Sequence, residues 1–183
     1  HIWRKAIFKH TLDQQRRIFR SGTGRSVFCG LNWKKMEGRS GMDFVAKYFQ
    51  ELTTVELYEI LKARAQVFVV EQRCVYQDLD DVDYGSLHIF CRSGQMVLAY
   101  LRVFPKAGEA GAVQMGRVLT TERKTGLGGR LLREGIRIVR ETMGAGKIYL
   151  EAQCYAVGFY EREGFKICSG EFLEDGIPHV QME

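Results

Sequence analysis

The 183-residue sequence lacks a cysteine framework, because its five cysteines form an odd set without a C-x-x-C pair. This pattern argues against a disulfide scaffold and a cysteine-based zinc site, and it fits a reducing compartment. No apolar run approaches the ~20 residues that cross a bilayer, and the N-terminal segment lacks the apolar centre of a signal peptide. We therefore expect a soluble, cytoplasmic protein without a metal.

Most of the chain lacks a net positive charge, although the net charge of the whole sequence is +5. Residues 1–41 carry ten Lys or Arg against two acids, whereas residues 42–183 carry seventeen against twenty. We therefore expect a basic N-terminal appendage over 1–41, derived from a leader or an artificial extension, and one domain over 42–183 that buries its own core. Counterion release would let the appendage bind nucleic acid, but we do not expect nucleic acid to be the partner.

Hydrophobic periodicity along the domain predicts a mixed α/β order. A capping-box pattern, Thr53 with Glu56, announces a helix, and an acidic loop follows at 72–85. The expected buried stripe of this helix is Leu57, Ile60, Leu61, Ala65 and Phe68. Further helices are expected at 126–142 and 155–163, and strands at 44–49, 87–91, 96–103, 113–120, 147–153, 166–173 and 179–182.

A glycine-rich turn joins the strand at 113–120 to the next helix. Glycines without a Cβ let backbone N–H groups approach a ligand, and the free N–H groups and positive dipole end of the helix favour a phosphate there. The turn therefore predicts a phosphorylated cofactor. Its residues are Arg123, Lys124, Thr125, Gly126, Leu127, Gly128, Gly129 and Arg130.

Two common phosphate motifs are absent from this turn. A dinucleotide fingerprint starting at Gly126 would need a glycine where Leu131 stands, and no Gly-Lys-Ser or Gly-Lys-Thr closes a P-loop. What remains, Arg-x-x-Gly-x-Gly between a strand and a helix, resembles the pyrophosphate loop of GNAT acyltransferases, which move an acetyl group from acetyl-CoA to an amine.

Other blocks of the chain strengthen this resemblance, which covers roughly 44–182. Residues 153–165, QCYAVGFYEREGF, are similar to the second GNAT signature, with Gln153 where Asn is usual. Four further blocks resemble, more specifically, the ElaA-like branch of the superfamily. They are residues 68–80, FVVEQRCVYQDLD, His88, residues 116–118, GRV, and residues 174–179, EDGIPH.

The resemblance implies a mixed, largely antiparallel sheet of six to seven strands, flanked by about four helices and splayed between the fourth and fifth strands. It implies that the pantetheine of acetyl-CoA binds the backbone of Val118, Leu119 and Thr120, with an N–H near Val118 for the oxyanion. The expected activity is an acetyl-CoA-dependent N-acetyltransferase with direct attack by a primary amine of a small molecule or a protein. A homodimer is left open.

The position of Tyr160 in the second signature makes it the expected general acid. The same position makes it a cofactor-binding residue, close to the sulfur of CoA. A phenol stays protonated at neutral pH and can donate to a thiolate. The base is less determined. Glu71 and His88 are our candidates. Asp78, Asp80 and Asp83 also lie near the expected acceptor side, where carboxylates would hold an ammonium substrate, and His179 follows Asp175 in the closing hairpin.

Each of these side chains also has a plainer interpretation. Tyr160 can be a packing residue, the acidic loop can be solvated, and Glu71 or His88 can be a buried hydrogen-bonding residue. For the whole chain, the alternative function is a non-catalytic acyl-CoA-binding or protein-interaction module, because a fold does not by itself fix chemistry.

Overall fold

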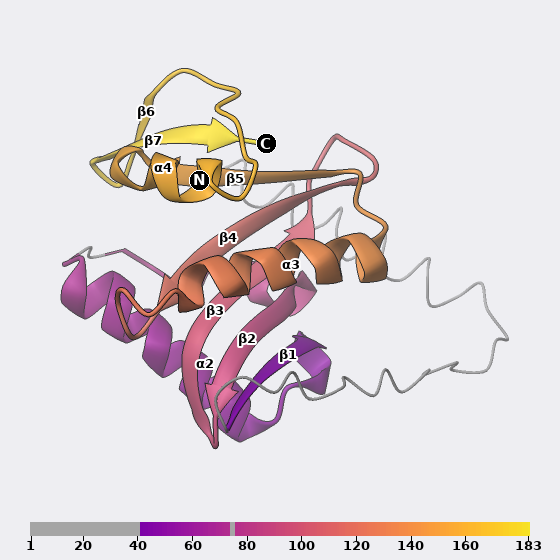
Figure 1. The fold of residues 1–183 in the computed structure, drawn as a ribbon, viewed down its shortest axis with the longest axis vertical. Coiled ribbons are helices and arrows are strands. Elements are labelled where there is room, and N and C mark those ends of the chain that lie inside the picture. The colour runs from indigo at the N-terminus through magenta and orange to yellow at the C-terminus, as the bar shows by residue number, and fades with distance from the viewer. Residues whose placement is uncertain (1–40, 74–75) are drawn as a thin grey trace, which may run out of the picture. The chain divides into compact units, whose positions relative to one another are not determined.

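A computed structural model describes residues 41–73 and 76–183 as one domain built on a seven-stranded sheet (Figure 1). Its order is β1-β2-β3-β4-β5-β7-β6, and neighbouring strands run antiparallel except for the parallel pair β4 and β5. This confirms the predicted mixed, largely antiparallel sheet. The basic appendage predicted over 1–41 lies, except for its last residue, outside the described residues. The strands are β1 (Met42–Tyr48), β2 (Leu87–Ser93), β3 (Met96–Pro105), β4 (Ala112–Thr120), β5 (Lys147–Gln153), β6 (Phe172–Glu174) and β7 (Ile177–Met182).

The helix α2 (Thr54–Arg64) begins at the predicted capping box. The backbone N–H of Glu56 donates to Thr53 Oγ1 at 3.2 Å, and the N–H of Thr53 donates back to Glu56 Oε2 at 2.9 Å. A π-helical segment, η2 (Ala65–Glu71), continues it. The predicted buried stripe is wrong at Ala65, which is exposed, whereas Glu56 and Arg64 are buried. Both charged residues pair with opposite charges, so a pattern of apolar residues alone could not place the buried face.

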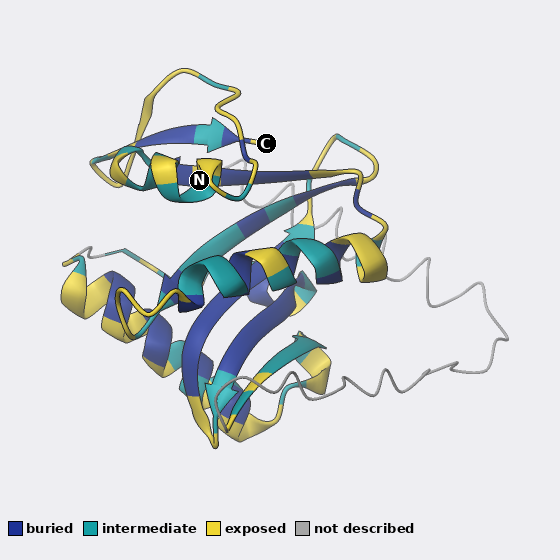
Figure 2. Cartoon of the chain, viewed as in Figure 1, coloured by how far each residue is buried: buried dark blue, intermediate teal, exposed yellow. Residues whose placement is uncertain are grey.

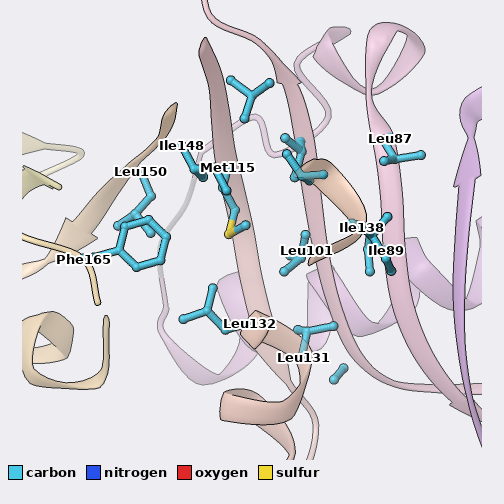
Figure 3. Packing of buried hydrophobic residues seen from close by; sticks show 14 of the residues in the cluster. Leu87, Ile89, Leu101, Met115, Leu131, Leu132, Ile138, Ile148, Leu150 and Phe165 are labelled. Atoms are coloured by element: carbon cyan, nitrogen blue, oxygen red, sulfur yellow. The ribbon is translucent and has the colours of Figure 1, made fainter. Parts of the chain in front are cut away.

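The helix α3 (Leu127–Met143) packs its apolar stripe on one face of the sheet, as predicted. Leu131 and Leu132 lie with Leu101 of β3 and Met115 of β4 in the larger core cluster (Figure 3). Helix and sheet approach closely, since a Cβ on Gly135 would lie 2.9 Å from Leu101 Cδ2. A second cluster, with α2, covers the other face (Figure 2).

The fourth and fifth strands pair over only part of their length. Ala112–Met115 of β4 is hydrogen-bonded in register with Lys147–Leu150 of β5, and beyond those residues the two strands diverge (Figure 1). A β-bulge bends β4 at the same level, because Tyr100 opposite Leu119 and Arg102 opposite Gly116 leave an extra residue in β4. The predicted splay between the fourth and fifth strands is therefore confirmed.

The C-terminal part of the chain completes the sheet beyond the splay. A 3-10 turn, η4 (Cys154–Ala156), leads from β5 into the short helix α4 (Val157–Glu161), and β7 then returns antiparallel to β5. A further 3-10 turn, η1 (Phe49–Glu51), follows β1, and another, η3 (Val82–Gly85), precedes β2. None of the helices in the described ranges is long and apolar enough to span a membrane.

Candidate active site

The turn before α3 has an open backbone. Gly126, at the N-cap of α3, has a left-handed φ of 75°, a conformation that favours glycine. The Leu127 N–H donates to Thr125 Oγ1 at 3.4 Å, and residues 122–126 are exposed. Because the first N–H groups of an α-helix lack partners within it, the turn presents donors and a positive dipole end at the surface.

Two glycines let this turn pack against the elements on either side of the splay. A Cβ on Gly128 would lie 3.4 Å from the Phe159 ring of α4 and 3.6 Å from Thr120 Cγ2 at the end of β4. A Cβ on Gly129 would lie 3.0 Å from Glu163 Oε1. The glycine-rich turn, the end of β4 that does not pair with β5, and α4 therefore meet at one place.

The basic residues of the turn point in different directions. Arg123 Nη2 donates to Glu71 Oε2 at 2.8 Å, whereas the Arg130 guanidinium lies 5.5 Å from the ring centroid of Phe44 on β1. Lys124 is exposed with a φ of 61°. The structure thus brings Arg123 together with Glu71, two predicted site residues, and directs Arg130 toward β1.

Tyr160, the predicted acid, lies on α4 beside the turn. Its ring packs edge-to-face on Phe159, at 5.0 Å between centroids, and on Phe165, at 6.2 Å. Burial, and then the nearby Tyr155, raises the pKa of Tyr160 above its ordinary value. Within the described residues, no group forms a hydrogen bond with its hydroxyl. A phenol that has no hydrogen-bond partner among the described residues is therefore held next to the splay.

His88, a predicted base, is a buried structural residue. Its Nδ1 lies 2.8 Å from the Tyr100 hydroxyl and its Nε2 lies 3.0 Å from the Asp83 carbonyl oxygen, so both ring nitrogens are occupied. The side chain is 1% exposed, and burial lowers its pKa. The arrangement matches the plainer of the two interpretations, and it leaves no ring nitrogen to receive a proton from an acceptor.

Three aspartates of the acidic loop, Asp78, Asp80 and Asp83, are buried or half-buried in an ion-pair network. Arg64 Nε lies 2.8 Å from Asp78 Oδ2, and its Nη1 lies 2.7 Å from Asp83 Oδ1. Arg102 contacts Asp80 and Asp83, and Arg117 Nε lies 2.6 Å from Asp78 Oδ1. Three arginines therefore neutralise the three aspartates that we considered as ligands for an ammonium group.

The network sets the ionisation of its carboxylates. Burial alone would raise the pKa of Asp78, but hydrogen bonding and charge from Arg64, and then from Arg117, lower it below its ordinary value. At Asp80, burial alone would likewise raise the pKa, but hydrogen bonding and charge from Arg102 lower it below its ordinary value. Because Arg117 lies in the bulge of β4, the network also anchors the acidic loop beside the splay.

Polar side chains of β5 and β7 lie together on the β5 side of the splay. Sequence reasoning did not bring them together. Glu151 of β5 and His179 of β7 face the side of the sheet opposite α3, because their neighbours Ala152 and Val180 enter the core under α3. The sequence places His179 only in the closing hairpin, after Asp175. The strand pairing that places it beside β5 is not visible in local sequence patterns.

Cys154 lies between β5 and α4 without the features of a nucleophile. Its Sγ lies 3.7 Å from Glu171 Oε2. Burial, and then the charge of Glu171, raises the pKa of its thiol, which favours the unreactive protonated form. In the part of the chain that the structure describes, no three His, Cys, Asp or Glu side chains are grouped to hold a metal ion.

Comparison with known proteins relates this geometry to a family. The model of the acetyltransferase (GNAT) domain matches residues 51–183. UPF0039 protein C11D3.02c from Schizosaccharomyces pombe is 40% identical over 147 residues, which cover 78% of this chain and 97% of that protein. Protein ElaA from Escherichia coli is 33% identical over 139 residues, which cover 74% of this chain and 91% of ElaA.

Solved structures agree with these sequence matches. The crystal structure of an acyl-CoA N-acyltransferase from Pseudomonas aeruginosa superposes with a TM-score of 0.72 at 35% identity, over 78% of this chain and 98% of that one. The crystal structure of E. coli ElaA superposes with a TM-score of 0.71 at 32% identity, over 77% and 97% of the two chains.

Proposed function

The chain belongs to the GNAT acyl-CoA N-acyltransferase family, and from that premise we propose that it is an acetyl-CoA-dependent N-acetyltransferase of primary amines. We assign the activity to residues 42–183. The acceptor is a small-molecule amine or an amine of a protein. The observation that carries the proposal is the divergence of β4 from β5 beside both the glycine-rich turn and Tyr160.

Binding of acetyl-CoA is supported by the two kinds of backbone group that meet there. The turn from Arg123 to Arg130 offers N–H groups and a helix dipole to the pyrophosphate. The stretch Val118 to Thr120 lies beyond the last residue of β4 that pairs with β5, so it can hydrogen-bond the amides of the pantetheine. A thioester held at this level lies near α4.

The reaction that we propose is direct attack in a ternary complex. The amine nitrogen attacks the thioester carbon, the C–N bond forms, and the carbonyl oxygen becomes an oxyanion. A backbone N–H near Val118 stabilises this oxyanion, a kind of contact worth ~3 kcal/mol in other acyl-transfer enzymes. The C–S bond then breaks, and Tyr160 donates its proton to the departing thiolate. The raised thiol pKa of Cys154 favours this route over a covalent acyl-cysteine.

A turnover assay on the full chain tests the proposal. The purified protein is given acetyl-CoA and a panel of amines, peptides with free N-termini and peptides with lysine, and thiol release is read together with product mass. We expect a product heavier by one acetyl group and an equal amount of free CoA. Binding of acetyl-CoA by calorimetry without turnover on any member of the panel would instead identify a non-catalytic binding module.

A further inference from the structure

Resting on the proposed acetyl transfer, the geometry points to His179 as the catalytic base, in place of Glu71 and His88. His179 lies on β7, directly opposite Gln153 at the end of β5. Its side chain keeps 9% of its surface exposed. Three features of its surroundings support the assignment: a fixed tautomer, a position across the sheet from the acid, and neighbouring carboxylates.

The tautomer of His179 is set by the backbone. Its Nδ1 lies 2.8 Å from the carbonyl oxygen of Ile177, and a carbonyl can only accept, so Nδ1 carries the proton. Nε2 is then left with its lone pair, as a proton acceptor requires. Nε2 lies 3.9 Å from Glu174 Oε2, which is beyond hydrogen-bonding distance. Stacking on Phe172, at 6.1 Å between ring centroids, holds the imidazole plane.

His179 and Tyr160 lie on opposite faces of the sheet. Tyr160 packs against the core cluster under α3, which includes Ala152 and Val180. Side chains alternate along a strand, so His179, next to Val180, projects to the other face, as does Glu151, next to Ala152. A thioester lying where β4 and β5 diverge would therefore have the acid on one face and the base on the other. That separation suits attack on one side of the carbonyl and departure of sulfur on the other.

The groups around His179 suit a cationic acceptor. Glu151 and Glu174 supply carboxylates, and Lys106 and Arg117 are the cations within electrostatic reach of Glu151. Desolvation, and then the charge of Glu174, raises the pKa of Glu151 above its ordinary value. An ammonium group entering from this face would be attracted by both carboxylates. Glu174, at 3.9 Å, would also stabilise the imidazolium formed when Nε2 takes a proton.

The proton balance of the step is simple. An acceptor that arrives as an ammonium first releases one proton to water and becomes the neutral amine. The amine nitrogen then loses one proton to His179 Nε2 as the C–N bond forms, and the sulfur gains one proton from Tyr160 as the C–S bond breaks. The imidazolium then releases its proton to water, and the phenolate regains one. No other co-reactant is required.

The test uses the full chain and the variant His179→Asn, whose amide can still donate to the Ile177 carbonyl but has no basic nitrogen. We expect kcat to fall about 100-fold or more, the usual size of a general-base contribution, with acetyl-CoA affinity and melting temperature unchanged. The acid limb of the pH profile should disappear. Added imidazole should restore part of the activity of His179→Gly, which a purely structural role would not allow.

Two further measurements separate this role from packing. Nitrogen NMR of the wild type should report His179 protonated at Nδ1 and unprotonated at Nε2. Leu173→Ala changes an exposed residue of the same hairpin and should keep full activity. Turnover by His179→Asn within threefold of wild type, with its acid limb intact, would overturn the base assignment and leave acetyl transfer standing. Absence of any wild-type turnover would overturn both.

Discussion

Glu71 and Arg123 form an ion pair, with Glu71 Oε2 2.8 Å from Arg123 Nη2, that links the end of η2 to the turn before α3. The arginine lowers the pKa of Glu71, so the carboxylate is a poorer base than an ordinary glutamate. The same contact occupies Nη2 of Arg123, whose side chain is otherwise exposed. A phosphate of CoA and the carboxylate of Glu71 would therefore compete for one guanidinium.

We expect Glu71→Gln to strengthen acetyl-CoA binding by about twofold to fivefold, the range of an exposed ion pair, because Arg123 is released for the phosphate. kcat should change little. Calorimetry with CoA and a steady-state assay measure the two quantities. A large loss of kcat with unchanged affinity would instead support the original expectation that Glu71 is the base.

The features that were predicted from sequence are local ones. The capping box at Thr53 and Glu56 and the glycine turn at Gly126 depend on residues within a few positions of each other, so their patterns could be recognised directly. The splay between the fourth and fifth strands followed from the family resemblance, and the strand pairing confirms it.

The features that were missed depend on residues far apart in the chain. Asp78 meets Arg117 across 39 positions, and nothing within the acidic loop indicates that its charges are paired. For His88 the sequence left open a base or a buried hydrogen-bonding residue, and its partners on β3 and η3 are distant enough that no local pattern shows them. His179 acquires its neighbours only through the pairing of β7 with β5 and β6. Sequence patterns thus predicted the glycine-rich turn before α3 better than the side chains that meet around the acidic loop and β7.

Gly128→Val should weaken CoA binding at least tenfold. A Cβ added at Gly128 would lie 3.4 Å from the Phe159 ring. A branched side chain would therefore displace α4 or fill the space in which we propose that the backbone binds the pyrophosphate. Gly170→Ala, where a Cβ meets nothing within 4 Å, is the matched control and should bind CoA normally. Calorimetry with CoA and a melting curve for each variant check the result. Normal affinity in Gly128→Val would remove this turn from the cofactor site.

Tyr160→Phe should lower kcat by about 100-fold, a typical general-acid contribution, while CoA still binds. The raised pKa of Tyr160 keeps its phenol protonated to higher pH than a free tyrosine, whose pKa is ~10. Ionisation of this acid should therefore cause no fall in wild-type kcat between pH 8 and about 10. A stopped assay over that range, with an amine that is neutral throughout, measures it. Full turnover by Tyr160→Phe would assign the residue to packing alone.

The ion-pair network of the acidic loop predicts how the free energy of unfolding depends on pH. Asp78 and Asp80 have lowered pKa values in the folded protein, whereas in the unfolded chain they titrate near the ordinary ~3.9. The unfolded state then binds more protons at low pH, so the stabilisation is fully present above about pH 5 and is lost as the pH falls toward the folded-state pKa values.

We therefore expect the wild-type free energy of unfolding to be level near neutrality and to fall steeply below about pH 4. Asp80→Asn should start from a lower stability, since Arg102 loses a buried partner, and should then show a shallower acid slope because one linked carboxylate is gone. Denaturant titrations at fixed ionic strength from pH 7 to 3 measure both curves. Equal slopes in the two proteins would mean that Asp80 contributes nothing to the linkage. The acid dependence of the network would then rest on Asp78, whose pKa is also lowered by its arginine partners.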